Sequence, residues 1–430
     1  MQNQKNMTKA RSLLGSLLVT GLLGGCVGVD RDKSLAVAPK HAPAPRVKVV
    51  ESGESKLRPE ECRGIIVGPG VNQPDPFPGW GGFVGWESPI RLKNGTWIVG
   101  FNAGYWHASV STPMQYSPKN FEEYSRMGMP TNIVAPTGGR AMFTRSTDEG
   151  KTWSKPETLI DTPADDRHPA FVQLDDGTVL CCFFIYLGDE PEEPGKIPAP
   201  HIFFIRSFDN GKTWEKKPTP LGTPHFHETD GPFAKLKDGS VLLAINGRPQ
   251  GAPDQCGIFR SANRGKTWKL LSIIKAAHDL QECTVAELPD GRWVMMARPE
   301  GDISWSSDKG KTWTQPVTFG MRMYAPSLTV LRDGTLVCLH GSYARGGLRV
   351  IFSNDGGVTW IAPAKDHGFL VDTSYGYGKP MELPDGTLFI SYLATGGHSG
   401  SDAQQNAIRC IRLRIRADHS GIDLLPAPKR

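Results

Sequence analysis

Side chains that enzymes use as nucleophiles, acids and bases recur at one relative position in this chain. Six positions lie nine residues before the glycine of a turn dipeptide, and they are Trp86, His168, Asp230, Glu282, Ala325 and Tyr377. Four of these are polar or ionisable, although the segments that follow them are mostly apolar. Tyrosine, glutamate, aspartate and histidine can act as nucleophile or as general acid and base when they meet in one site. Such chemistry requires elements that bring the six positions together.

The turn dipeptides themselves predict those elements. Each dipeptide interrupts an apolar run and leads into a β-rich segment such as 178–184. Asn-Gly and Asp-Gly between such runs are typical of β-hairpins. The chain therefore contains six predicted hairpins, with turns at Asn94-Gly95, Asp176-Gly177, Asp238-Gly239, Asp290-Gly291, Asp333-Gly334 and Asp385-Gly386.

A second repeat, Ser-x-Asp-x-Gly-x-Thr-Trp, lies between the hairpins. Its five copies end at Trp153, Trp214, Trp268, Trp313 and Trp360, and the third copy has Asn263 in place of the aspartate. We expect the aspartate to accept backbone N–H bonds in a tight turn, the glycine to supply a positive φ, and the tryptophan to wedge between neighbouring sheets. The motif resembles the Asp-box, a structural repeat of bacterial neuraminidases and other β-propellers. Its aspartates are therefore assigned no chemistry.

One hairpin followed by one Asp-box hairpin supplies four strands, which is the content of a propeller blade. Six such units predict an all-β fold, a six-bladed β-propeller with four-stranded antiparallel blades, over residues 61–430. The sixth blade lacks an Asp-box and ends in the alternating strand 407–416. Because the first strand of each blade lines the axis, the six positions should converge near one face. A ring of mutually satisfied polar groups is the alternative to an active site.

The N-terminal 25 residues have the pattern of a bacterial export signal, with Lys5, Lys9 and Arg11 before the apolar run 13–23. The Leu-Gly-Gly-Cys sequence that ends at Cys26 resembles a lipobox, which implies lipidation of Cys26 and anchoring in the cell envelope, in the outer membrane or at the surface of a bacterium. Residues 26–60, rich in proline and alanine, are expected to form a flexible tether. The mature protein is predicted to be a monomer that contacts the membrane through its lipid.

Charge and cysteine content argue against several classes of function. Removal of the signal would reduce Lys and Arg from 49 to 46 against 44 Asp and Glu, so the mature chain is nearly neutral and no nucleic-acid partner is indicated. The seven other cysteines are scattered, and their spacing fits no metal site. We interpret them as buried thiols. No metal and no other cofactor is predicted.

Two of the six positions lie in segments that resemble the sialidase (neuraminidase) superfamily. Residues 281–298 are similar to the sialidase stretch in which a triad arginine follows a catalytic glutamate by sixteen residues, a spacing that Glu282 and Arg298 reproduce. Residues 375–386 are similar to the segment that carries the nucleophilic tyrosine nine residues before the turn glycine. This spacing selects Tyr377 rather than Tyr375.

The resemblance covers residues 80–415 and implies a further site arginine. Residues 343–353 precede an Asp-box as the third triad arginine does in sialidases, which favours Arg345, with Arg349 as the alternative. The implied activity is that of a retaining exo-glycosidase that removes terminal sialic acid, or a related acidic sugar, from glycoconjugates. Sialic acid carries a carboxylate on its anomeric carbon, so a neutral tyrosine avoids the repulsion that a carboxylate nucleophile would meet. Glu282 would take the phenolic proton, and the arginines would bind the substrate carboxylate.

The sequence departs from the sialidase pattern at the first inner strand. With the prolines aligned, Glu87 stands where the first triad arginine belongs. A carboxylate at this place would repel the substrate carboxylate. Arg91, Arg140 or Arg167 would then have to complete the triad.

The aspartate that serves the family as acid/base is also missing, since no Asp occurs between Asp75 and Asp148. A long insert rich in aromatic residues, Gly and Pro occupies this region, and long loops over a binding face are more often functional than idle. Within the insert, Trp106 is a candidate sugar platform and His107 is a candidate acid.

Two segments that precede inner strands add polar candidates. Residues 165–169 contribute Asp166, Arg167 and His168 to substrate binding, and residues 225–232 contribute Asp230 as a further catalytic candidate. Their spacings match no metal template. Two other functions stay open, namely a glycosidase that acts on a different sugar through a carboxylate pair and a non-catalytic surface propeller that binds glycans. A carboxyl separation of ~5 to 5.5 Å would indicate retention, and ~6.5 to 9.5 Å inversion.

Overall fold

The computed structural model describes residues 43–427 except 79, 106–108, 110–137, 187–200, 224, 231, 250, 252, 375 and 395–405. The chain divides into two compact units, Met1–Val37 and Ala38–Arg430, and all described residues belong to the second. The predicted export signal, Cys26, Trp106 and His107 lie outside the described residues. No helix in the described part of the chain is long and apolar enough to cross a membrane.

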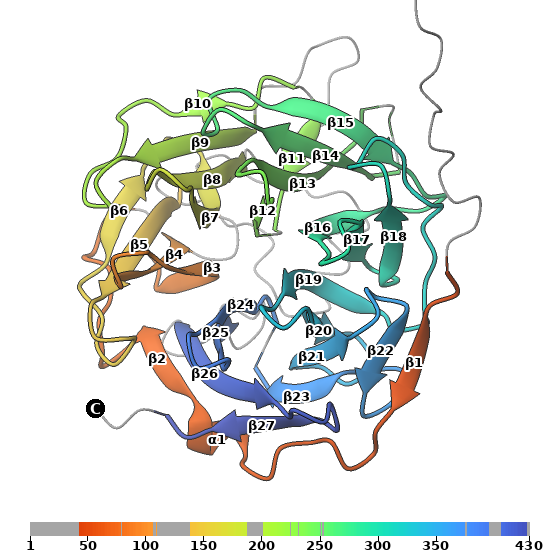
Figure 1. Ribbon diagram of the computed structural model, residues 1–430. Coiled ribbons are helices and arrows are strands. Elements are labelled where there is room, and N and C mark those ends of the chain that lie inside the picture. The colour runs from red at the N-terminus through yellow and green to blue at the C-terminus, as the bar shows by residue number, and fades with distance from the viewer. Residues whose placement is uncertain are drawn as a thin grey trace, which may run out of the picture. The chain divides into compact units, whose positions relative to one another are not determined.

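Six antiparallel sheets surround a common axis in chain order, which confirms the predicted all-β, six-bladed β-propeller (Figure 1). We number these sheets as blades 1 to 6. From the axis outward, blade 1 contains β3 (Phe83–Arg91), β4 (Trp97–Gly104), β5 (Arg140–Ser146) and β6 (Glu157–Ile160), and blade 2 contains β7 (Asp165–Gln173), β8 (Val179–Tyr186), β9 (Ile202–Ser207) and β10 (Thr219–Pro220).

Blades 3 and 4 depart from four continuous strands. The inner strand of blade 3 is split in two, and blade 4 has three strands in its sheet. Blade 3 contains β11 (Phe226–Glu228), β12 (Ala234–Lys235), β13 (Val241–Gly247), β14 (Gln255–Ser261) and β15 (Lys269–Ile274), and blade 4 contains β16 (Gln281–Glu287), β17 (Trp293–Arg298) and β18 (Asp302–Ser306).

Blades 5 and 6 carry additional outer strands. Blade 5 contains β19 (Met323–Val330), β20 (Leu336–Ser342), β21 (Leu348–Ser353), β22 (Thr359–Ala362) and β23 (Phe369–Asp372), and blade 6 contains β24 (Lys379–Glu382), β25 (Leu388–Ala394), β26 (Ala407–Ile415) and β27 (Ile422–Leu425).

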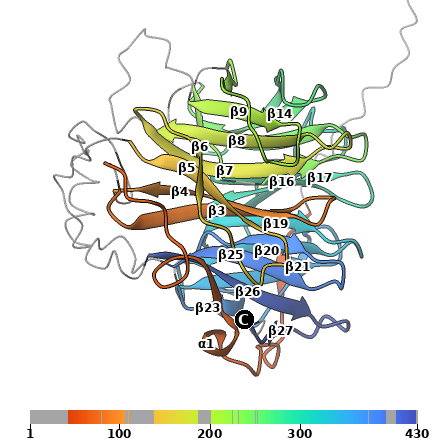
Figure 2. The ribbon, with the colours of Figure 1, turned by 90° about the vertical axis from the view of Figure 1, so that its left-hand side faces the viewer.

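Segments from the N-terminal side complete the last two blades. Strand β2 (Gly64–Val67) pairs antiparallel with residues 408–410 of β26, next to β27, which pairs with residues 412–415, so one of the two outer strands of blade 6 comes from the beginning of the propeller. The helix α1 (Pro59–Cys62) precedes β2 and packs beside β23, β26 and β27 (Figure 2). Strand β1 (Arg46–Val49) pairs in parallel with β22. This part of the segment predicted as a tether is therefore structured.

The Asp-box turns hold themselves together as the sequence predicts. The hydroxyl of Ser146 donates to Asp148 at 2.7 Å and accepts from the N–H of Gly150, while the N–H of Thr152 donates to Asp148 at 2.9 Å. In the third copy, the amide nitrogen of Asn263 donates to Thr267 Oγ1, which maintains the turn without a carboxylate. The motif is structural in every copy.

The Asp-box tryptophans pack between blades. Trp214 of blade 2 lies 6.1 Å from Phe143 of blade 1, measured between ring centroids, and 5.7 Å from Phe171. Trp360 of blade 5 is fully buried in a cluster with residues of blade 4. The seven described cysteines are free thiols, and all but Cys410 are buried, as predicted.

Closure of the ring by β2 can be tested at Ile66. Its side chain is fully buried against Val84, Trp97 and Ile408. We expect Ile66→Ala to lower the free energy of unfolding by about 2 to 5 kcal/mol, because it leaves a cavity between the two ends of the ring. Val71→Ala, at an exposed position just after β2, should change it by less than about 0.5 kcal/mol in the same denaturant titration. Equal effects would show that β2 does not close the ring.

Candidate active site

The inner strands share a local distortion that aims side chains at the axis. Five of the six equivalent positions have left-handed backbone conformations, with φ of 50° at Trp86, 52° at His168, 46° at Glu282, 46° at Ala325 and 73° at Tyr377. The pairing register shifts at these positions in β3, β7, β16 and β19. Such a bulge breaks the alternation of side chains along a strand and redirects the extra residue.

The redirected side chains meet near the axis. The rings of Trp86 and His168 stack at 4.9 Å between centroids, and His168 lies edge-on to Tyr377 at 6.4 Å. Tyr324, which precedes Ala325, lies 6.1 Å from Tyr377. The structure thus brings residues of blades 1, 2, 5 and 6 into one aromatic cluster.

Tyr377 and Glu282 form the central polar contact of this cluster. The hydroxyl of Tyr377 donates to Oε1 of Glu282 at 2.6 Å. The other oxygen, Oε2, accepts the backbone N–H of Ala325 at 2.6 Å and lies 3.2 Å from Nε of Arg298. The left-handed backbone at Ala325 therefore serves to present an N–H group to the carboxylate. Glu282 is held by a phenol, an amide and a guanidinium.

The electrostatics of Glu282 combine burial with a partner cation. Burial raises the pKa of Glu282, whereas Arg298 and the hydrogen bond from Tyr377 counteract this rise. Burial by itself would lower the pKa of Arg298, but the charges of Glu282 and of the other acidic groups around it together raise this pKa. Arg298 thus keeps its charge beside a carboxylate that can accept a proton.

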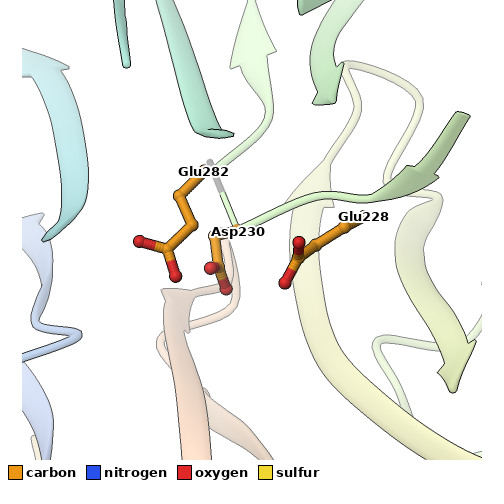
Figure 3. Close-up of side chains that lie close together, drawn as sticks. All are labelled: Glu228, Asp230 and Glu282. Carbon is orange, nitrogen blue, oxygen red and sulfur yellow. The ribbon is translucent and has the colours of Figure 1, made fainter. Parts of the chain in front are cut away.

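Two further carboxyl groups lie beside Glu282 (Figure 3). Oxygen atoms of Glu228, Asp230 and Glu282 are all within 4.8 Å of one another, with Asp230 in the middle of the row. Three carboxylates at this spacing could hold a hard cation such as Ca²⁺. Two cations of the protein already lie next to the cluster, since Arg298 contacts Glu282 and Nζ of Lys379 donates to the backbone carbonyl of Asp230.

Asp230 and His168 are buried together. One oxygen of Asp230 contacts Nδ1 of His168. Burial raises the pKa of Asp230 to about 6, although Lys379 opposes the rise, and burial lowers the pKa of His168 well below its usual value. The pair is therefore an uncharged imidazole beside a carboxyl group that titrates in the physiological range.

Glu87 is completely buried, and neither of its carboxylate oxygens has a hydrogen-bond partner among the described residues. Burial raises its pKa well above the usual range, with the charge of Lys379 opposing and that of Asp230 adding to the rise. A protonated Glu87 places no negative charge at the axis. The repulsion expected for a substrate carboxylate is removed in this state.

Comparison with known proteins agrees with this geometry. Residues 169–390, just over half of the chain, match the model of the BNR repeat-like domain. The chain belongs to the BNR repeat-like domain family. A sialidase of Bacteroides fragilis is 22% identical over 309 residues, which are 60% of this chain and 54% of that sialidase. The chain therefore spans about half the length of this relative.

Solved structures share the fold of this BNR-repeat propeller. A protein of unknown function from Dyadobacter fermentans has 21% identity and a TM-score of 0.61, covering 83% of this chain and 98% of that one. The Hadza microbial sialidase Hz136 has 18% identity and a TM-score of 0.55, covering 80% and 66%. A variant of the NanB sialidase from Streptococcus pneumoniae has 14% identity and a TM-score of 0.55, covering 78% and 68%. The propeller has the fold of the sialidase superfamily.

Residues 165–168 of the BNR-repeat propeller do not all face the site. Some of their side chains contact the aromatic cluster, and others contact the neighbouring loop. The guanidinium of Arg167 lies 4.8 Å from the ring centroid of Trp86 and 4.4 Å from that of Tyr186, and its Nε donates to Asp165 at 2.7 Å. Asp166 instead accepts hydrogen bonds from the N–H and hydroxyl of Thr162. Arg167 and His168 thus face the aromatic cluster, whereas Asp166 stabilises the loop before β7.

The other predicted arginines lie in different surroundings. Arg345 is exposed on the turn between β20 and β21. Arg349 is buried and donates to the carbonyl oxygens of Gly346 and Gly368. Arg140 forms an ion pair with Asp161 at 2.9 Å, and Arg91 is the last residue of β3. Arg298 is the predicted arginine that contacts Glu282.

Several site residues were not singled out from the sequence. They are Glu228, Asn246, Tyr324, Lys379 and Tyr343, whose ring lies 5.2 Å from that of Tyr324 between centroids. No local pattern singles out Lys379, because Tyr377 has a left-handed backbone and lies before β24, so the alternation of a strand does not relate the two residues. Glu228 lies in the polar segment 225–232, but its spacing from Asp230 gave no reason to choose it. Asn246 comes from a segment without an unusual pattern, whereas the two tyrosines lie near residues singled out for other reasons, Ala325 and Arg345.

Burial of the Asp166 carboxyl group should make the stability of the folded protein depend on pH. Burial raises its pKa to about 7, well above the ~3.9 of an unfolded chain. Its contribution to stability is therefore complete below about pH 4 and is lost as the pH rises through 7. We expect Asp166→Asn to increase the free energy of unfolding by about 1 to 3 kcal/mol at pH 8 and to leave it unchanged at pH 4 in urea titrations.

Asp209 of the second Asp-box supplies a control of opposite sign. Hydrogen bonds from Thr213 lower its pKa to about 2, so its contribution is present at neutral pH and is lost as the pH falls through that value. Asp209→Asn should therefore destabilise the protein at pH 8. A higher free energy of unfolding at pH 8 for both variants would show that the raised pKa of Asp166 is not the cause.

Proposed function

We propose that this protein is a sialidase-like, retaining exo-glycosidase in which Tyr377 is the nucleophile and Glu282 is its general base. The observation that carries the proposal is the 2.6 Å hydrogen bond from the Tyr377 hydroxyl to Glu282 Oε1. The membership in the BNR repeat-like family and the fold shared with sialidases support it. The substrate we propose is a glycoconjugate with a terminal sialic acid or related acidic sugar.

The geometry gives each residue a defined task. A phenol has an unperturbed pKa of ~10 and is a weak nucleophile until a base removes its proton. Glu282 is within hydrogen-bond distance of that proton, and Arg298 and the N–H of Ala325 hold its second oxygen in place. Attack of the phenolate oxygen on the anomeric carbon would give a glycosyl-tyrosine intermediate. Water would then hydrolyse the intermediate with retention.

An acidic substrate requires cations at the site. Arg298 keeps its charge next to Glu282, and a quarter of its side chain is exposed, so it can also reach a ligand. Arg167 is held between two aromatic rings on the other side of the cluster. We assign these two arginines to the substrate carboxylate. Arg167 would take the place of the family arginine whose position Glu87 occupies.

Inversion by a pair of carboxylates has less support. In inverting enzymes the carboxyl groups are ~6.5 to 9.5 Å apart to admit a water molecule. The oxygens of Glu228, Asp230 and Glu282 lie within 4.8 Å of one another.

Anchoring of the enzyme to the cell envelope through Cys26 is a part of the proposal that rests on the sequence.

The tyrosine mechanism is tested with Tyr377→Phe and Glu282→Gln on a fluorogenic α-sialoside and a panel of neutral glycosides. We expect Tyr377→Phe to abolish sialoside cleavage and Glu282→Gln to lower kcat by at least about a hundredfold, as loss of a general base does. Tyr392→Phe is the matched control, because it removes a buried hydroxyl that donates to Asp372 at 2.7 Å outside the site.

Three outcomes of this experiment are distinct. Loss of activity in the two site variants but not in the control supports the mechanism. Activity that survives Tyr377→Phe would exclude Tyr377 as nucleophile. Saturable glycan binding without turnover in the wild-type protein would exclude the enzyme and establish a binding propeller.

The role of the two arginines is tested with Arg298→Lys and Arg167→Lys. Lysine keeps the charge but not the paired donors, and a charged hydrogen bond contributes about 1.5 to 3 kcal/mol, so KM for an acidic glycoside should rise about 10- to 150-fold. Arg206→Lys, which changes an arginine paired with Glu215 in blade 2, is the control. Unchanged KM in both site variants would remove these residues from substrate binding.

A further inference from the structure

The proposed mechanism leaves one task without a residue. Cleavage of a glycoside needs a group that protonates the departing oxygen and later takes a proton from water. Tyr377 and Glu282 are already occupied with forming the nucleophile. The sequence has no Asp between Asp75 and Asp148, where the family acid/base aspartate is expected. His107, the candidate acid of that region, lies outside the described residues, and the carboxyl groups at the axis can take the same role.

Glu228 has the position and access that this task requires. It is the last residue of β11 and is partly exposed, in contrast to the buried Asp230 and Glu282. An oxygen of its carboxyl group lies within 4.8 Å of oxygens of both. In Figure 3 it approaches the row of carboxyl groups from the side opposite Glu282.

A buried amide fixes Glu228 relative to Glu282. Oδ1 of Asn246 accepts the backbone N–H of Glu282 at 3.2 Å, and Nδ2 of Asn246 donates to Oε2 of Glu228 at 3.4 Å. Asn246 is fully buried on β13, so it can hold both residues in one arrangement. Positioning of this kind is what acid–base catalysis needs from the scaffold.

A second feature supports a proton-handling role at this place. Asp230 lies between the two glutamates and is 4% exposed, and its Oδ2 has no hydrogen-bond partner among the described residues. A buried carboxyl oxygen without a partner is unfavourable unless it holds a proton or receives one. Because its pKa is raised to about 6 by burial, Asp230 can retain a proton within reach of Glu228.

We propose that Glu228 is the general acid/base of the reaction, with Asn246 as its positioning residue. This assignment rests on the proposed function. In the first step, the bond between Tyr377 Oη and the anomeric carbon forms as the bond to the leaving oxygen breaks. The phenolic proton passes to Glu282, and the proton of Glu228 passes to the leaving oxygen.

The second step reverses both proton transfers. Water attacks the anomeric carbon, its proton goes to Glu228, and the bond to Tyr377 breaks as Glu282 returns its proton to the phenolate. Each carboxyl group recovers its starting state, so no further reactant is needed. The sugar is released with its original configuration.

The test compares Glu228→Gln with wild type on two substrates that have the same sugar but different leaving groups. On a natural oligosaccharide, whose departing oxygen needs a proton, kcat/KM should fall by about 10²- to 10⁴-fold. On the 4-methylumbelliferyl glycoside, which departs as a stable anion, kcat/KM should change far less. Azide, a nucleophile that needs no base, should accelerate turnover of the aryl substrate by the variant and yield a glycosyl azide.

Controls separate this assignment from its alternatives. Glu287→Gln, at the other end of β16, should behave as wild type on both substrates. Thermal unfolding of each variant, together with the activity of Glu228→Asp, reports any loss of fold. If Glu228→Gln lowered kcat/KM equally on both substrates, or on neither, Glu228 would not be the general acid/base. The role of Tyr377 as nucleophile would be unaffected.

Two other results would also overturn it. In the first, a chelator lowers the activity of the wild type as Glu228→Gln does, and Ca²⁺ restores it. The carboxyl cluster would then be a cation site. Absence of turnover by the wild type on every substrate would remove the proposed function, and the assignment of Glu228 with it.

Discussion

The left-handed backbone of the inner strands is the constraint on which the site depends. A residue other than glycine with positive φ costs about 1 to 3 kcal/mol, and four inner strands contain one at the equivalent place, while a fifth, Tyr377, lies just before β24. Ordinary strand geometry would alternate side chains between two buried faces. The bulges in β3, β7, β16 and β19 instead direct one residue of each of these strands to the axis, and hydrogen bonding to the second strand on both sides of the bulge holds it there.

Stability and chemistry are separated along each blade. The Asp-box turns bind their own backbone, and their tryptophans fill the space between sheets. Ring closure by β2 joins the first and last parts of the propeller. These contacts overdetermine the position of every inner strand. The axis can therefore hold residues that would destabilise a smaller or looser fold.

Several acidic side chains are buried near the axis, and few cations lie beside them. Glu282 has Arg298 as a partner, and Lys379 lies against Asp230 and near Glu87. Protonation of Glu87 and Asp230 supplies the remaining neutralisation, because burial raises the pKa of both groups. A site of this kind can store and move protons, which is the requirement of acid–base catalysis.

The sequence determined the six hairpins, the five Asp-box turns and the six equivalent positions, because these depend on local turn chemistry and on two repeats along the chain. Spacing from the turn glycine placed Tyr377 and Glu282 among these positions, and the resemblance to sialidases distinguished them from the other four. The sequence could not show that Glu87 is buried with a raised pKa, or that Asp166 binds Thr162 instead of facing the site. Neighbouring β-strand residues face opposite sides, and a bulge of one residue reverses which side each faces.

Tertiary structure alone decided which side chains meet. The contact of Asn246 with Glu228 and Glu282 joins residues of blades 3 and 4 that no local pattern relates. The use of β2 as an outer strand of blade 6 joins residues more than three hundred positions apart. Packing of the whole ring sets such contacts, since they depend on distances between blades rather than on the periodicity within one.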